Sequence, residues 1–520
     1  MISTAFLPLA APAALAAGAL AAFHLDGRRA ARAYAAVEAM ALVALAAAAA
    51  SICLLIFSGS ATSPLIGTAG VGISIRLDSV SVTMLSLVAF VGWVVIRYAR
   101  SYLAGEARQG AFLGWIAATL ASVLLLVSAG NLAQLAASWI AASLFLHRLL
   151  LFYPERPAAV RAARKKFIAA RMGDAALIGG AVLLAVAYDT ADIAAIRDAA
   201  RAGETSSAVL IATVLLAAAA LLKSAQFPIH GWLTEMMETP TPVSALLHAG
   251  VVNAGGFLLI RFADVMLLAP ITLAALVLIG GFTALFGSLA MLTRPAVKTS
   301  LAWSTVAQMG FMILQCGLAL FPLALLHIVA HSLYKAHAFL AAGSAVENVA
   351  AIRRPGPVAR PDGKAVLRAF ALALLIYAAI GLGFGIEGKS PQALALGAIL
   401  IFGVAYLLAQ GLADAAPRAL TLRTCIYAVA ASVGYFALQT AAEMLTVGTL
   451  PAVPAPEPLE WALMGLALLS FGAVAVAQAL LPHWAGHPAV AGLRVHLANG
   501  FYVNAVFDRL IGGWKTGRTS

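Results

Sequence analysis

Fifteen long apolar segments, separated by short connections, run through almost the entire chain. A helix needs about 20 consecutive, mostly apolar residues to cross a bilayer. Because 63% of the 520 residues are hydrophobic and only 10% are charged, the composition excludes a soluble enzyme. The apolar residues do not alternate as they do in barrel strands. We therefore predict an all-α polytopic membrane protein with about 15 transmembrane helices, at about 5–23, 36–58, 79–99, 111–128, 130–153, 167–188, 205–224, 241–263, 269–292, 300–320, 322–346, 366–386, 391–412, 421–442 and 458–481.

Positive charge is concentrated in every second connection. Connections after odd-numbered segments, together with the C-terminal tail, hold 24 of the 33 Lys and Arg residues. Connections after even-numbered segments hold only 4. Cytoplasmic loops of membrane proteins carry such an excess. The pattern predicts an external N-terminus and a cytoplasmic C-terminus, and it explains the net charge of +12 without nucleic acid as a partner.

Several common functional motifs are missing from the sequence. It has no P-loop, no glycine-rich dinucleotide motif, no C-x-x-C pair and no haem motif. Cys53, Cys316 and Cys425 lie within apolar segments, so we expect them to be buried and to bind no metal. The first segment has no basic region before it, which favours a span over a cleaved signal. We expect no enzyme activity, cofactor or metal in this chain.

Two ionisable residues stand out in the middle of the chain. An ionised side chain at the centre of a membrane helix costs at least about 2.5–3.5 kcal/mol, so each such residue is a functional candidate. Lys223 ends an apolar run and is followed by SAQFPIHGWL, in which Pro228 lacks a backbone donor. This predicts a helix broken at membrane depth, as in transporters, although a lysine near a span end can also reach the headgroups. His248, in the next helix, suits either a proton relay or simple packing.

A second ionisable group lies in the segment LLHIVAHSLYKAHAF. His327, His331 and Lys335 recur at every fourth position, so they share one helix face over about 12 Å. No carboxylate or cysteine on this helix completes a metal site. Neighbouring basic groups that cannot all be charged at once suit stepwise proton transfer, and helix packing is the alternative. His337 points off this face.

Acidic residues near these groups are further candidates for the ion path. Asp174 begins the sixth span three residues after Arg171, which favours either a local ion pair or a place on the path. Glu235 and Glu238 follow the predicted break, and they either pair with Lys223 across it or face the cytoplasm.

The tail after the last span is amphipathic. Over 493–514 the apolar residues fall on one helical stripe, so we predict one amphipathic helix. It either lies on the membrane surface or docks a partner subunit. The residues that would dock a partner are Phe501, Phe507, Leu510 and Trp514.

Three stretches of the sequence resemble a known family. They are LKSAQFPIHGWLTEMMETPTPVSALLHAGVVNAGGFLLIRF, HIVAHSLYKAHAFLAAGS and, in the tail, NGFYVNAVFDRL. They are similar to the proton-translocating membrane subunits of respiratory complex I and Mrp-type antiporters. The resemblance implies two inverted five-helix repeats, each with a broken helix. The implied organisation is 1–110 for spans one to three, 111–263 and 264–415 for the two repeats, 416–485 for the C-terminal helices and 486–520 for a cytoplasmic tail.

The resemblance also implies roles for individual residues. Lys223 matches the central lysine of the family, and His248 matches the next relay residue. His327 and His331 match the path from the centre to the exit, while Lys335 and Asp174 fall on ionisable positions. Lys389, in GIEGKSPQAL, stands where the second broken helix has its lysine, in surroundings that look shortened.

At several positions the sequence departs from the usual family pattern, and these departures indicate one branch of the family. Ile140 stands where the fifth span usually has a glutamate, and Gly231 and Thr234-Glu235 replace a usual Thr and Pro-Asp. We also expect the protein to lack the long lateral helix of the largest complex I subunit. These features look most like the membrane subunit of DAB-type inorganic carbon accumulation complexes of the bacterial inner membrane. The resemblance implies a large cytoplasmic partner similar to a zinc β-carbonic anhydrase, with the zinc in that partner.

Three functions remain open from the sequence. The first is a proton- or sodium-conducting subunit that drives CO2 hydration and bicarbonate accumulation by the partner. The second is a pumping or antiporting subunit of a complex I-like, hydrogenase-linked or Mrp-type assembly. The third is a structural membrane anchor whose ionisable residues have lost their role.

Overall fold

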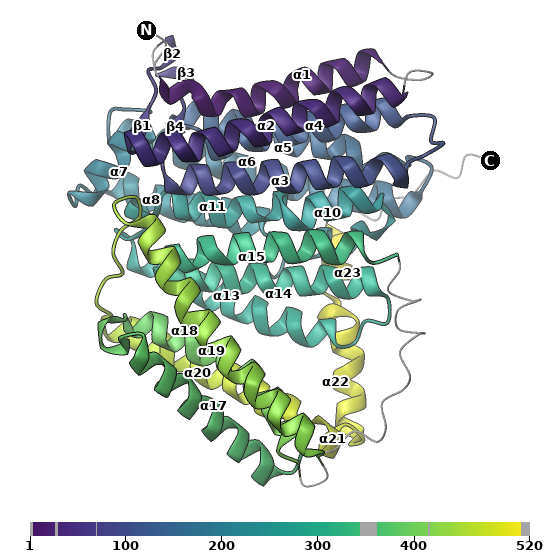
Figure 1. The fold of residues 1–520 in the computed structure, drawn as a ribbon, viewed down its shortest axis with the longest axis vertical. Helices are drawn as coiled ribbons and strands as arrows, with labels where there is room; N and C mark the ends of the chain where they lie inside the picture. The colour runs from purple at the N-terminus through teal and green to yellow at the C-terminus, as the bar shows by residue number, and fades with distance from the viewer. Residues whose placement is uncertain (1–3, 26–29, 69, 344–360, 414–415, 511–520) are drawn as a thin grey trace.

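The computed structural model describes residues 4–25, 30–68, 70–343, 361–413 and 416–510, and it is a bundle of long helices (Figure 1). Each of the fifteen predicted spans coincides with a helix or an interrupted helix. They are α1 (Ala10–His24), α2 (Ala30–Ser58), α3 (Ser79–Tyr102), α4 (Gln109–Val127), α5 (Leu132–Leu150), α6 (Pro157–Ala187), α8 (Ser207–Lys223), α10 (Thr241–Ala249) with α11 (Ala254–Arg261), α13 (Pro270–Met291), α14 (Val297–Gly317), α15 (Phe321–Leu340), α17 (Gly363–Gly383), α18 (Pro391–Gly411), α19 (Arg418–Thr446) and α20 (Pro458–Ala479).

Thirteen of these helices, within the described ranges, are long and apolar enough to cross a membrane. The other two are α8, which has only 17 residues, and α14. α8 packs on α6, and α14 packs on α13. The predicted all-α membrane fold with about fifteen helices is therefore confirmed.

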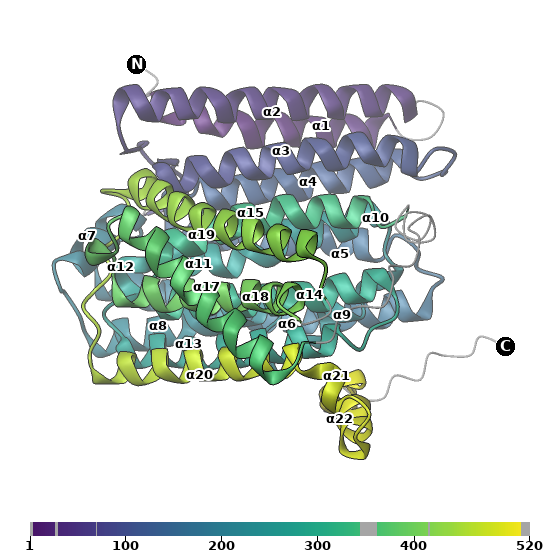
Figure 2. The same ribbon diagram turned by 60° about the horizontal axis from the view of Figure 1, so that its bottom comes forward.

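The short elements gather at the two ends of the bundle (Figures 1 and 2). The strand end holds two antiparallel strand pairs and the short helices α7 (Ile193–Arg201) and α12 (Ala263–Met266). Its strands are β1 (Ala61–Thr62), β2 (Ile66–Thr68), β3 (Val71–Ile73) and β4 (Arg76–Leu77). The tail end holds α9 (Gly231–Thr234), η3 (Met236–Glu238), α21 (Leu481–Trp484), α22 (Pro488–Ala498) and α23 (Val503–Leu510). The N-terminal turn η1 (Thr4–Leu9) contacts β4 at the strand end, so the chain begins and ends on opposite ends, as an odd number of spans requires.

The interrupted helix α10–α11 lies at the centre of the bundle. It contacts α3, α8, α14 and α15, and 94% of the residues in its most apolar stretch are buried. Pro242 at the start of α10 suits a helix N-terminus, because proline's missing donor is not needed there. The short helix η4 (Val251–Asn253) then separates α10 from α11. This central position places His248 in the protein interior.

Both predicted broken helices are present. After α8 ends at Lys223, the chain is irregular until α9 and η3, and α10 begins only at Thr241. After α17 ends at Gly383, the left-handed Gly385 and the short helix η5 (Ile386–Gly388) lead to α18. The first interruption spans 224–240 and the second only 384–390, so the second is shortened as the sequence indicates.

Two predictions were wrong. Cys53 is exposed on the outer surface of α2 rather than buried, because α2 packs on its neighbours through one face only, and Cys425 is half-buried; only Cys316 is buried as predicted. The tail is not one amphipathic helix over 493–514. It bends between α22 and α23 at η6 (Gly500–Tyr502), where three successive residues have φ of 57°, 51° and 61°. Trp514 lies outside the described residues.

Candidate functional site

Lys223 is a buried lysine at the end of α8, where the helix breaks. Its Nζ lies 4.3 Å from the centre of the Trp139 ring, close enough for a cation–π contact. It has no hydrogen-bond partner among the residues that the structure describes. The charges that act on it are those of Asp174 and Arg171 on α6. A lysine held this loosely can give up or accept a proton without first breaking a strong ion pair.

Asp174 supplies the carboxylate near Lys223. It forms an ion pair with Arg171 at 2.6 Å, so the local pair considered from the sequence is present. Ile140, in the usual glutamate position of α5, is half-buried beside Trp139. The negative charge that acts on Lys223 therefore comes from Asp174 on α6, and the same carboxylate also pairs with Arg171.

Lys166 is a member of this cluster that sequence reasoning missed. It is buried on α6, and its Nζ donates to the backbone oxygen of Ser143 at 2.7 Å and to the Ser143 hydroxyl at 2.9 Å. The charges of Lys223, Arg171 and Asp174 act on it. It stands in a basic run, Arg164-Lys165-Lys166, which by itself indicates only membrane topology. Its spacing of about two helical turns from Asp174 is the sequence signal that could have placed the two side chains near each other.

Glu235 and Glu238 do not pair with Lys223. Both Glu235 carboxylate oxygens accept hydrogen bonds from Lys165 Nζ at 2.7 Å, and Glu238 pairs with Arg156 at 3.2 Å. The two glutamates lie at the tail end, beyond the break, where connections are basic. Of the two alternatives drawn from the sequence, pairing across the break is therefore wrong.

His248 lies one helix further along, stacked on the Phe339 ring at 4.4 Å. Its Nδ1 lies 3.1 Å from the Thr305 hydroxyl, while its Nε2 has no hydrogen-bond partner within the described part of the chain. His331 Nε2 donates to the backbone oxygen of His248 at 3.2 Å. The central helix and α15 are thus joined through the two histidines.

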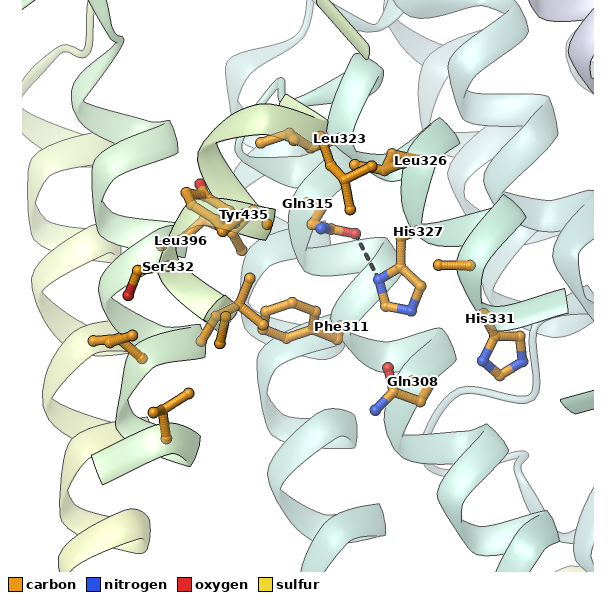
Figure 3. Close-up of a pocket in the computed structure, with 18 of the residues that line it drawn as sticks. Gln308, Phe311, Gln315, Leu323, Leu326, His327, His331, Leu396, Ser432 and Tyr435 are labelled. Atoms are coloured by element: carbon orange, nitrogen blue, oxygen red, sulfur yellow. Dashed lines mark hydrogen bonds between the residues drawn. The ribbon is translucent and has the colours of Figure 1, made fainter. Parts of the chain in front are cut away.

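The group on α15 is ordered along one face, as its spacing predicts. The His327 and His331 rings lie 6.0 Å apart. His327 Nδ1 lies 2.9 Å from Gln315 Oε1 on α14 (Figure 3). Lys335 Nζ turns toward α14, where it donates to the Ser304 hydroxyl at 2.7 Å and to the backbone oxygen of Leu301 at 3.2 Å. His337 is exposed.

A cavity of about 750 Å³ adjoins the two histidines (Figure 3). It separates α14 and α15 from α17, α18 and α19. His327, His331 and Gln308 line one side, and Ser432 and Tyr435 line the other. A space of this size with polar groups on both sides can hold several water molecules.

Lys389 lies beyond this cavity, at the second break. Its Nζ forms an ion pair with Glu443 on α19 at 2.7 Å and donates to the Thr440 hydroxyl at 3.2 Å. Only 10% of the lysine side chain is exposed, against 42% of the glutamate side chain. The second broken helix therefore carries a lysine that is tied to a carboxylate.

A buried ion network at the strand end was also missed. Arg261, at the end of α11, bonds to Asp78 at 2.7 Å, and Arg197 of α7 bonds to Asp264 at 2.9 Å. Burial alone would raise the pKa of Asp78, but Arg261 and Arg76 hold that pKa well below its usual range. The pairs join residues up to 183 positions apart, so no local sequence pattern predicts them. They fix the strand ends of α3, α7 and α11.

Comparisons with known proteins agree with this geometry. The sequence pattern described as "NADH:quinone oxidoreductase/Mrp antiporter, TM" matches residues 129–359. The pattern described as "NADH-Ubiquinone oxidoreductase (complex I), chain 5 N-terminus" matches residues 65–113. Helix bundle, broken helices and buried ionisable residues together define an antiporter-like membrane subunit. The chain belongs to the family of NADH:quinone oxidoreductase and Mrp antiporter membrane subunits.

Within the family, several similar relatives are named as inorganic carbon transporter subunits. The chain is 38% identical to the probable inorganic carbon transporter subunit DabB2 of Halothiobacillus neapolitanus, over 85% of this chain and 81% of that protein. It is 46% identical to the probable DabB subunit of Hydrogenovibrio crunogenus, but that match spans only about half of each protein, 53%. Subunit L of the NADH-quinone oxidoreductase of Escherichia coli is 34% identical over 54% of this chain and 46% of its own length.

Solved structures share the fold. A chain of the Mrp complex from Dietzia sp. DQ12-45-1b superposes with a TM-score of 0.64 at 24% identity, over 98% of this chain and 59% of that chain. A chain of respiratory complex I from Thermus thermophilus superposes with a TM-score of 0.56 at 19% identity, over 96% of this chain and 99% of that chain.

Proposed function

We propose that the protein is the cation-conducting, energy-coupling membrane subunit of an inorganic carbon transport complex. The similarity to the DabB2 subunit over most of both chains supports the type of complex. The observation that carries the conducting role is Lys223, a buried lysine at a helix break without a hydrogen-bond partner among the described residues. The chain itself is a transporter subunit rather than an enzyme.

The proposed path runs along the buried ionisable groups. A cation, either a proton or sodium, enters near Lys223, whose charge state is set against Asp174 and Arg171. When the cation is a proton, His248 and then His331 and His327 pass it on, because each imidazole can take up a proton on one nitrogen and release one from the other. Water in the adjoining cavity bridges gaps too long for direct hydrogen bonds.

We propose that a large cytoplasmic partner carries the CO2 chemistry. It would resemble a zinc β-carbonic anhydrase, hold the zinc, and hydrate CO2 to bicarbonate in one direction when driven by cation flow. The tail offers a surface for it, since Phe501 is 47% exposed and Leu510 is 79% exposed. In this arrangement the complex lies in the bacterial inner membrane, with the tail end of the bundle in the cytoplasm and the N-terminus outside.

The function is tested by reconstituting uptake in cells. The protein is produced with its neighbouring large subunit in a bacterium that lacks carbonic anhydrase, and accumulation of labelled inorganic carbon is measured. We expect accumulation only with both subunits, and we expect it to collapse when an uncoupler removes the proton gradient. Accumulation that survives the uncoupler, with sodium also equalised, would refute the energy-coupling role.

Docking on the tail is tested separately. Val506→Asp with Leu510→Asp should release the partner on purification while this chain stays in the membrane, because two charges then lie in an apolar contact. A partner that still co-purifies in equal amounts would assign these side chains to the membrane surface instead.

The second candidate is an antiporting or pumping subunit of a complex I-like assembly. It is favoured by the 36% identity to subunit L of the Mycobacterium tuberculosis NADH-quinone oxidoreductase, over 53% of this chain. Sodium–proton exchange by everted vesicles that contain this chain without the large partner would support this candidate over the first.

A further inference from the structure

The tail folds back onto the loop of the first broken helix. Asp508 of α23 pairs with Lys165 Nζ at 2.5 Å, and the same Nζ holds both carboxylate oxygens of Glu235. Only 3% of the Lys165 side chain is exposed. One buried lysine therefore joins α6, the broken-helix loop and the tail.

A second contact depends on shape. A Cβ atom added to Gly231, the first residue of α9, would lie 1.4 Å from Asn504 Oδ1 and 2.3 Å from its Cγ. Any other residue at position 231 would push Asn504 out of place. The glycine thus provides the space that the tail occupies.

A third contact covers a buried histidine. His230 is 1% exposed, and neither ring nitrogen has a hydrogen-bond partner in the described ranges. Its ring packs between those of Phe286, at 5.2 Å, and Trp303, at 5.1 Å, and Gly500 of the tail lies against Trp303. Left-handed backbone at Phe501 and Tyr502 costs free energy and persists only where the surroundings impose it.

We propose that Asp508 is a positioning residue for the ion path: the tail holds the loop 224–240 in the conformation that serves Lys223, and Gly231 leaves the space that this close approach needs. The inference rests on the proposed function and deepens it. A broken helix leaves backbone groups without helical partners, so its loop needs support from elsewhere in the chain. The opposite face of α23 is the proposed docking surface. One helix, α23, would therefore contact the partner on one face and hold the loop of the ion path on the other.

The steric contact is tested by a double-mutant cycle. Gly231→Ala should lower carbon accumulation about three- to tenfold, the range expected when a small group is forced into a filled space. Asn504→Ala alone should change it less than about twofold, and the double variant should regain most of the loss, because the alanine leaves room for the new methyl group. A silent Gly231→Ala, or a double variant no better than Gly231→Ala, would overturn the proposal.

The ion pair is tested with Asp508→Asn, and Arg509→Gln serves as control because Arg509 is the exposed next residue. Protection of His230 is measured in membranes by diethyl pyrocarbonate modification and mass spectrometry. We expect His230 to be protected in the wild type and in Arg509→Gln, and at least about threefold more reactive in Asp508→Asn. Asp508→Glu should restore protection.

Accumulation and partner co-purification are measured on the same samples. Asp508→Asn should keep the partner and lose accumulation, which separates positioning of the loop from docking. Unchanged His230 protection in Asp508→Asn would overturn the proposal. A wild type that accumulates nothing would instead defeat the proposed function, while the protection measurement still decides the role of the tail.

Discussion

The two broken helices carry lysines in opposite situations. Lys223 lies against an aromatic ring, and Asp174, the acidic residue whose charge acts on it, is already paired with Arg171. Lys389 is bound directly to Glu443 at 2.7 Å. The first lysine is free to change its charge, whereas the second must break an ion pair to do so. The two lysines therefore differ in chemistry.

The loops around the two lysines differ in the same way. The first interruption spans 224–240 and is held by the tail, through Lys165 and Gly231. The second spans only 384–390 and is fixed by local turns and by α19. A long, supported loop gives room for an ion path, while a short one gives a rigid connection. We infer that the break at Lys223 serves the ion path, whereas the connection that carries Lys389 mainly stabilises the fold.

The largest expected effect separates the two lysines. Lys223→Met should lower carbon accumulation at least about a hundredfold, the lower range for loss of a proton-transferring side chain. Lys389→Met should lower it only a few-fold, because it removes one partner of a fixed pair. Accumulation of labelled inorganic carbon is compared at equal amounts of the assembled complex.

Equal losses in the two lysine variants would contradict the asymmetry. Wild-type accumulation in Lys223→Met would contradict the path itself and return the chain to the role of a membrane anchor.

The next effect separates conduction from packing on α15. His331→Gln should assemble and yet lose most accumulation, since glutamine keeps the bulk but cannot take up and release a proton near neutral pH. His337→Gln, on the exposed side, should be nearly silent. The same uptake assay checks both. Two variants that behave alike, whether active or inactive, would favour packing.

The smallest effect concerns the ion pair of the second repeat. Glu443→Gln should release Lys389 at a cost in stability of about 0.2–1 kcal/mol, because the pair is partly exposed and screened. Accumulation should stay within about twofold of the wild type. Thermal unfolding of the purified complex measures the first quantity. A large fall in accumulation without loss of stability would show that the second lysine also conducts.

Much of the fold follows from local sequence. The fifteen spans, their helical nature and the two breaks are set by long apolar runs and by Pro228 and Pro391, since hydrocarbon tolerates no unpaired backbone over such lengths. The face shared by His327 and His331 follows from helix periodicity alone. The prediction that these residues form the path remains a prediction.

Only the tertiary structure decided which residues far apart in the chain contact each other. The sequence contained Glu235 and Glu443, but only packing assigned them to Lys165 and Lys389. The bend in the tail also escaped prediction, because the amphipathic stripe continues through residues whose left-handed backbone is imposed by a distant loop. The length of an apolar run and the periodicity of its residues are properties of one segment. The partner of a buried charge is a property of the whole fold, since it depends on which helices meet.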